Sequence, residues 1–153
     1  MTEPDSVAVL PEFLRNAATE SGSVIDYRDW QVPLGRRFRA LKLWAVLRWY
    51  GAEGLREHIR SGVGLAQELA GWVRADPRFE VVAPHPLGLV CLRLVEGDAA
   101  TEALLTAVNA SGKAYLSHTR VRGQYVLRVS IGATLTERRH VEALWALLRE
   151  LAA

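Results

Sequence analysis

Hydrophobic positions in the first half of the chain follow helical spacing in two consecutive stretches. Over residues 36–50 they occupy two faces, so that apolar side chains cover most of the helix surface. Gly51 ends this stretch, and residues 53–75 resume the helical spacing until Asp76-Pro77 stops it. A helix that is apolar most of the way round requires burial most of the way round. The pattern therefore predicts two helices and indicates that the first packs against something outside this domain.

Beyond the second helix, short apolar runs alternate with helical spacing. Helices are predicted over residues 99–109, with Asp98 as N-cap, and from the N-cap Thr136 to the end of the chain. The predicted strands span residues 78–83, 87–95, 114–119 and 124–131, the last two forming a hairpin around Arg122-Gly123. The sequence therefore predicts an α+β fold: an N-terminal arm and two helices, then a small, mainly antiparallel four-stranded sheet with helices on one face.

Composition narrows the class of protein further. Residues 1–23 are polar and interrupted by Pro4 and Pro11, which predicts an arm or linker ahead of a folded segment over residues 24–153. The net charge of +2, with both signs mixed, argues against nucleic acid as a partner. The chain shows neither a basic leader nor an apolar run near the roughly 20 residues that span a bilayer. The single Cys91 excludes an internal disulfide and fits a cytoplasmic location.

The sequence contains no recognisable catalytic or metal-binding set. Phosphate-binding glycine loops, nucleophile elbows, zinc motifs and paired cysteines are absent from it, and the four histidines are scattered. Arg36, Arg37, Arg39 and Lys42 could contact phosphates of a nucleic acid or pair with acids across an interface. Cations at the start of a helix oppose its dipole, which favours the structural alternative.

Arg128 is the most informative single charge, because it lies in the middle of a predicted strand between apolar neighbours. A buried arginine needs an anionic partner. Two kinds of partner remain open at this point: an Asp or Glu of the chain, or the carboxylate of a ligand.

A long run near the N-terminus carries a resemblance to a known family. Residues 24–51 read VIDYRDWQVPLGRRFRALKLWAVLRWYG. The part from Asp26 to Trp44 resembles the D-Y-[RK]-x-W-Q-[IV]-P-L-G-R-R-F-R-x-L-K-x-W signature of the group II pyridoxal-phosphate-dependent amino-acid decarboxylases, the aromatic-L-amino-acid decarboxylase family. The resemblance continues at residues 76–80 and 87–91. It implies the C-terminal part of such an enzyme, with the C-terminal domain of the fold-type I pyridoxal-phosphate-dependent transferase fold.

The resemblance also implies a cofactor and partners. Members of the family work as homodimers and bind pyridoxal 5'-phosphate through a lysine in a Ser-x-His-Lys motif of a large domain. Neither Lys42 nor Lys113 follows a histidine, so this chain lacks that lysine. We therefore expect a split, truncated or cut-down enzyme that begins just after the family's mobile catalytic loop. Such a chain would be inactive by itself and would pair with itself or with a separate chain carrying the lysine domain.

By resemblance, the expected substrate-binding residues are Leu34, Gly35 and Arg128. The Pro33-Leu34-Gly35 turn resembles one that shapes the neighbouring subunit's substrate pocket, where glycine leaves room for an aromatic ring. Arg128 matches an arginine that meets the substrate carboxylate in some members and is structural in others. Two functions remain open: part of a carboxy-lyase that converts aromatic amino acids to amines and CO2, or a non-enzymatic dimerisation or regulatory module derived from one.

Overall fold

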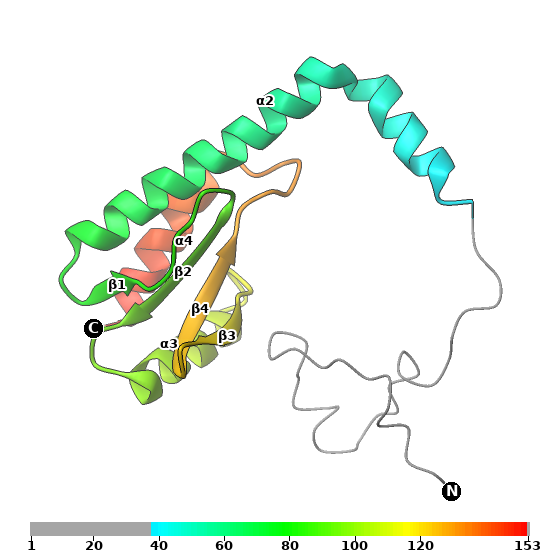
Figure 1. The fold of residues 1–153 in the computed structure, drawn as a ribbon. Helices are drawn as coiled ribbons and strands as arrows, with labels where there is room; N and C mark the ends of the chain where they lie inside the picture. The colour runs from blue at the N-terminus through cyan, green and yellow to red at the C-terminus, as the bar shows by residue number, and fades with distance from the viewer. Residues whose placement is uncertain (1–37, 153) are drawn as a thin grey trace, which may run out of the picture. The chain divides into compact units, whose positions relative to one another are not determined.

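The computed structural model describes residues 38–152 (Figure 1). The chain divides into two units between Trp49 and Tyr50. Helix α2 (Ala40–Ala75) crosses this division, but Gly51 within it has non-helical dihedral angles of φ 63° and ψ 179°. A positive φ is accessible to glycine without steric penalty. The predicted end of the first helix at Gly51 is therefore confirmed. The predicted arm over residues 1–23 lies outside the described residues.

The first stretch of α2, before Gly51, exposes every one of its side chains. Its large hydrophobic residues include Leu43, Trp44 and Trp49, of which Trp49 is 83% exposed. Contiguous apolar surface of this kind marks an interaction site more often than a solvated helix. The predicted all-round apolar character of this stretch is thus present in the structure, without cover from the described residues.

The second unit contains a four-stranded antiparallel sheet with the order β1-β2-β4-β3. Its strands are β1 (Phe79–Val81), β2 (Leu89–Leu94), β3 (Ser117–Val121) and β4 (Gln124–Ser130). Helix α3 (Asp98–Ala110) connects β2 to β3, and α4 (Arg138–Leu151) follows β4. β3 and β4 form a hairpin in which Arg122 and Gly123 both have positive φ, as a tight hairpin turn requires. The predicted hairpin is confirmed.

One face of the sheet carries the hydrophobic core and is covered by the helices (Figure 1). Leu69 and Val73 of α2, Leu92 of β2, Leu127 of β4 and Leu148 of α4 are completely buried there. At one end of the core the rings of Phe79 and Trp145 meet edge to face with their centroids 5.1 Å apart. This arrangement confirms the predicted α+β fold, with the second stretch of α2 joining α3 and α4 on the covered face.

The opposite face of the sheet carries the alternate residues of the central strands. Leu92, Leu94 and Leu127 belong to the core, so the intervening side chains of Cys91, Arg93, Val126 and Arg128 point to the other side. Cys91, Arg93 and Val126 are nevertheless buried, and Arg128 is half-buried. Two arginines thus lie on the face of the sheet that lacks the helices.

Several predicted boundaries are wrong by a few residues, for identifiable reasons. Asp98 is the first residue of α3 and not its N-cap, because its carboxylate bonds to Arg93 and the backbone of Gly97 precedes the helix. Thr136 does not cap α4 either. Glu137 is the N-cap, and its side chain and that of His140 form a reciprocal capping box. β3 begins at Ser117 and not at residue 114.

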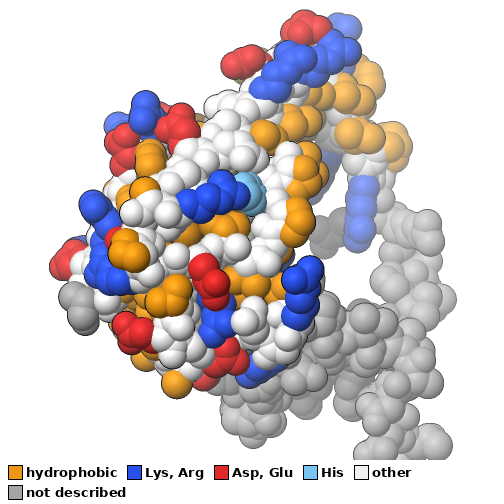
Figure 2. Space-filling model, turned by 60° about the vertical axis from the view of Figure 1, so that its left-hand side comes forward, with side chains coloured by type: hydrophobic (Ala, Val, Ile, Leu, Met, Phe, Trp, Pro, Cys, Tyr) orange, Lys and Arg blue, Asp and Glu red, His pale blue; other side chains and the backbone are white. Residues whose placement is uncertain are grey.

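The surface carries charges of both signs. On the face shown in Figure 2, Lys and Arg side chains are interspersed with Asp and Glu, and neither sign forms a continuous field. Across residues 38–152 no helix has the length and apolar character needed to cross a bilayer.

Candidate functional site

Of the three predicted substrate-binding residues, the structure describes Arg128. In the sheet it stands between Cys91 of β2 and Ser117 of β3, which are its Cα partners on either side. Its Nη1 donates to Ser117 Oγ over a distance of 3.5 Å, which is long for a hydrogen bond. The side chain is half-buried. The structure thus places a cation on the face of the sheet opposite to the described helices, within reach of neutral groups of both neighbouring strands.

The positive charge of Arg128 affects the pKa of the neighbouring Cys91 thiol. Burial raises the pKa of the Cys91 thiol above its ordinary value, and the positive charge of Arg128 acts in the opposite direction with the smaller effect. A thiol whose pKa is raised is protonated at neutral pH and is a poor nucleophile. Cys91 is therefore a buried free thiol that packs as a small side chain, and the described residues give it no catalytic role.

The other two predicted substrate-binding residues, Leu34 and Gly35, lie outside the described residues. Their expected roles rest on the sequence alone and stay predictions.

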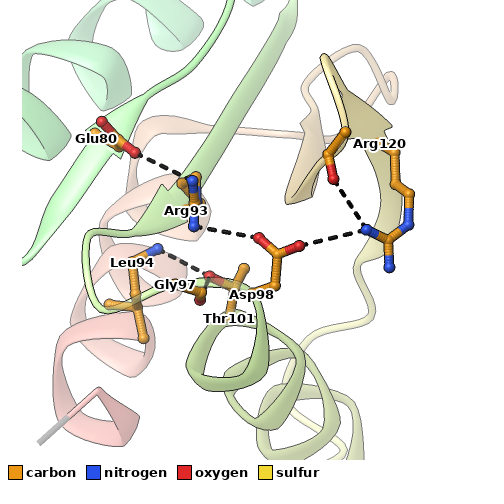
Figure 3. A network of polar contacts seen from close by, with 8 residues as sticks. Glu80, Arg93, Leu94, Gly97, Asp98, Thr101 and Arg120 are labelled. Atoms are coloured by element: carbon orange, nitrogen blue, oxygen red, sulfur yellow. Dashed lines mark hydrogen bonds and ion pairs between the residues drawn. The ribbon is translucent and has the colours of Figure 1, made fainter.

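Sequence reasoning missed Arg93 on β2, an arginine that is 7% exposed and more deeply buried than Arg128 (Figure 3). Its guanidinium pairs with Glu80 Oε1 at 3.6 Å and with Asp98 Oδ1 at 3.2 Å. Asp98 Oδ2 also pairs with Arg120 Nη1 at 3.3 Å, and Arg120 donates to the carbonyl of Gly123. Among residues 38–152, Arg93 Nε has no hydrogen-bond partner. These ion pairs tie β1, β2, α3 and β3 together on one side of the sheet, which is a structural role.

Asp76 and Arg78, which follow α2, form an ion pair that contacts the C-terminal end of α4. Asp76 binds Arg78 with both carboxylate oxygens, at 3.0 and 2.8 Å. Arg78 in turn donates to the carbonyls of Arg149 and Ala152 at the C-terminal end of α4. The hydrogen bonds from Arg78 hold the pKa of the Asp76 carboxyl below its ordinary value. This cluster caps a helix, satisfying carbonyls that α4 itself leaves unpaired.

The described residues do not fit a complete pyridoxal phosphate site. Such a site needs a lysine for the cofactor's carbonyl carbon and a polar partner for its ring nitrogen in an enclosed pocket. Lys42 and Lys113, the two lysines of the sequence, are both exposed. The cavity beside Lys113 has no carboxylate among its lining residues. Residues 38–152 also hold no cluster of His, Cys, Asp or Glu able to bind a metal ion.

Comparison with known proteins identifies the family. The model of the pyridoxal-dependent decarboxylase conserved domain matches residues 4–95. The chain is 49% identical over 152 residues to tryptophan decarboxylase 2 of Oryza sativa subsp. japonica, a match that covers 95% of this chain and 31% of that protein. It is 50% identical over 147 residues to a phenylacetaldehyde synthase of Arabidopsis thaliana, with coverages of 92% and 30%.

Solved structures agree with the sequence comparison. The crystal structure of Oryza sativa tryptophan decarboxylase with pyridoxal phosphate and tryptamine superposes with a TM-score of 0.74 at 44% identity. The superposition covers 97% of this chain and 33% of that one, so the chain spans about three-tenths of the length of its relatives. The predicted resemblance, the fold class and the dependence of the family on pyridoxal phosphate are confirmed. With more than half of its length matched, the chain belongs to the pyridoxal-dependent decarboxylase family.

Proposed function

We propose that this chain supplies the C-terminal part of a pyridoxal-phosphate-dependent decarboxylase of aromatic amino acids, and that it acts only together with the domain that binds the cofactor. The observation that carries the proposal is the identity of 49% to a tryptophan decarboxylase along almost the whole chain, together with about three-tenths coverage of that relative. The exposure of both lysines supports the second half of the proposal. The relatives are enzymes by name, so an enzymatic role is favoured over a purely structural one.

In the proposed enzyme, the cofactor would supply the electron withdrawal that lets the carboxylate leave. The role proposed for this chain is to bind and orient the amino acid. Gly35 would leave space for the aromatic ring, with Leu34 beside it. Arg128 would place a positive charge on the sheet face that lacks the helices, where it would attract the substrate carboxylate.

Partners follow from the same proposal. We propose a homodimer, or a complex with a separate chain that carries the Ser-x-His-Lys lysine, in the cytoplasm. The exposed apolar residues at the start of α2 support association in either form. The buried free thiol of Cys91 is compatible with a reducing compartment.

The test is reconstitution. The chain would be co-expressed with a polypeptide that carries the lysine motif, and release of CO2 and of the amine would be measured with tryptophan and with tyrosine. We expect no activity from the chain alone and cofactor-dependent activity from the pair. An active pair whose preference between the two substrates is unchanged by Gly35→Ser would contradict the pocket role. The matched control is Gly64→Ser, at a glycine of α2 with open space around the position of an added Cβ.

The alternative is a non-enzymatic module that dimerises or binds a decarboxylase as a regulator. The exposed apolar stretch of α2 supports this alternative, because such a surface also suits a dimerisation or regulatory module. Affinity purification from the native host, with mass spectrometry of the associated proteins, separates the two. Recovery of a lysine-bearing companion with the yellow colour of the cofactor supports the enzyme, and recovery of a colourless self-associated chain supports the module.

A further inference from the structure

Two large apolar side chains from distant parts of the sequence meet on the surface of the second unit. Ile59 of α2 is 59% exposed, and Leu87, in the connection between β1 and β2, is 65% exposed. Both line a hollow of about 230 Å³, together with Val63 of α2 and Ile131, which follows β4. A single exposed leucine is ordinary, but apolar side chains that converge on one hollow mark an interaction site. We call this feature the Ile59–Leu87 hollow.

The floor of the Ile59–Leu87 hollow is built from backbone contacts. Gly62 of α2 and Gly88 both lie against the carbonyl oxygen of Ile131, and a Cβ added to them would stand 3.1 and 2.3 Å from that oxygen. The N–H of Ile131 donates to the carbonyl of Gly88 at 2.6 Å. His58 Nε2 donates to the carbonyl of Gly132 at 3.2 Å. Because these contacts fix three segments against one another, the hollow is preformed, which lowers the ordering that binding requires.

Polar groups border this apolar centre. A second hollow of about 190 Å³ shares His58 and Gly62 with the first and adds the exposed side chains of Glu57 and Ser61 of α2. An apolar centre with a polar rim is the usual anatomy of a protein–protein interface. The apolar hollow is also smaller than the roughly 300–1,000 Å³ of small-molecule sites. It therefore suits one large side chain of a partner protein, of the kind that anchors an interface.

The length of the chain indicates what kind of protein covers this surface. The superposition on the Oryza sativa decarboxylase covers 97% of this chain and 33% of that one, so about two-thirds of that relative has no counterpart in this chain. Interfaces between domains of one protein resemble those between separate proteins. A unit that shares its fold with part of a larger protein is therefore expected to expose apolar side chains where the remaining part packs.

We propose that the Ile59–Leu87 hollow is the docking surface for the separate lysine-bearing chain that carries the cofactor-binding domain. That chain would insert one large apolar side chain between Ile59 and Leu87 and place polar groups opposite Glu57 and Ser61. The inference rests on the proposed function and adds to it the surface through which the two chains meet. This surface lies wholly within the second unit and is separate from the apolar stretch at the start of α2.

The experiment measures binding of the full 153-residue chain, carrying a fluorescent label, to the lysine-bearing polypeptide of the reconstitution, by fluorescence anisotropy. We expect Ile59→Gln and Leu87→Gln each to weaken this binding about tenfold or more, because each puts a polar amide where apolar surface is buried in the complex. Val95→Gln is the matched control. Val95 is also β-branched, is 54% exposed and lines neither hollow, so its replacement should leave the binding unchanged.

Self-association of the chain alone, measured by sedimentation equilibrium, should be the same in all three variants. Neither Ile59 nor Leu87 belongs to the core, so the melting temperatures should also agree. Weaker self-association of Ile59→Gln and Leu87→Gln would assign the hollow to a second copy of the chain and overturn the proposal. If the unchanged pair binds and releases CO2 but both variants bind equally well, this inference fails and the proposed function stands. If the unchanged pair neither binds nor releases CO2, the proposed function fails and the hollow loses its partner with it.

Discussion

Thr101 is a polar residue with no exposed surface, and its hydroxyl accepts a backbone hydrogen bond at the end of β2 where the pairing with β4 has ended. The pairing of β2 with β4 runs from Leu89 to Leu92 and does not reach Leu94. The N–H of Leu94 instead donates to Thr101 Oγ1 at 3.2 Å, and the hydroxyl donates to the carbonyl of Gly97 at 2.8 Å. One side chain of α3 thereby satisfies the end of a core strand and the backbone that precedes the helix (Figure 3).

Replacing this hydroxyl by a methyl group should be destabilising. Thr101→Val keeps the shape of the side chain but leaves the buried N–H of Leu94 without an acceptor, so we expect a loss of about 1–3 kcal/mol in the free energy of unfolding. Thr106→Val is the control, because Thr106 makes a similar bond to the carbonyl of Glu102 on the exposed side of α3. Its effect should stay within about 0.5 kcal/mol. Urea denaturation measures both, and equal losses would contradict the assigned role.

Cys91 makes a prediction about alkaline pH. Its folded-state pKa is raised by burial above the ordinary value of 9.0, so the folded chain holds this proton where the unfolded chain has released it. The unfolded state then binds fewer protons, and the free energy of unfolding should decline as the pH rises above about 9. Cys91→Ala should flatten this decline in urea denaturation at a series of pH values. An identical slope in the two proteins would remove Cys91 as its cause.

At the scale of the elements, the pattern of apolar positions predicted every helix and strand within residues 38–152, because each buries one face or stripe against a common core or leaves it for an interface. The exact ends were harder to predict. Asp98 and Thr136 are good N-cap residues by type. Asp98 is instead bound by Arg93 and Arg120, which lie on other elements, and the capping at α4 passes to the Glu137–His140 pair. Side-chain contacts that the apolar pattern does not encode decided these ends.

The candidate site also has a part that the sequence predicted and a part that it did not. The sequence predicted Arg128 in the middle of a strand between apolar neighbours. Because side chains alternate along a strand and Leu127 and Val129 belong to the core, Arg128 stands opposite the core face in the structure. The same alternation along β2 marks Arg93 between two core leucines, but its partners Glu80 and Asp98 became evident only from the folded arrangement of β1, β2 and α3.

The space around the glycines differs between the helix α2 and the segment before β2. An added Cβ at Gly88 would stand 2.3 Å from the carbonyl oxygen of Ile131, whereas Gly64 and Gly71 of α2 have nothing within 4 Å. We expect Gly88→Ala to lower the free energy of unfolding by about 1–3 kcal/mol through this clash. Gly64→Ala and Gly71→Ala should each raise it by about 0.5–1 kcal/mol, because alanine favours the helix. Thermal and urea denaturation test the three together, and a Gly88→Ala variant as stable as the unchanged chain would refute the close approach.

At the scale of the whole molecule, the first stretch of α2 has no apolar cover among the described residues, and this makes association the expected state. Leu43 is 61% exposed there, and Leu135, in the connection between β4 and α4, is 83% exposed but stands outside this stretch. We expect Leu43→Gln to weaken self-association, or binding to a lysine-bearing partner, about tenfold or more, since apolar burial drives such contacts.

Leu135→Gln is the matched control and should leave the association constant unchanged, because an isolated exposed leucine is ordinary on a protein surface. Sedimentation equilibrium over a range of protein concentrations measures both variants against the unchanged chain. Neither substitution removes a core contact, so the melting temperatures should agree and a difference in association cannot come from unfolding. An unchanged chain that stays monomeric at micromolar concentration, with no lysine-bearing partner bound, would show that this apolar stretch is not an interface. The dimer and the split enzyme would then both lose their main structural support.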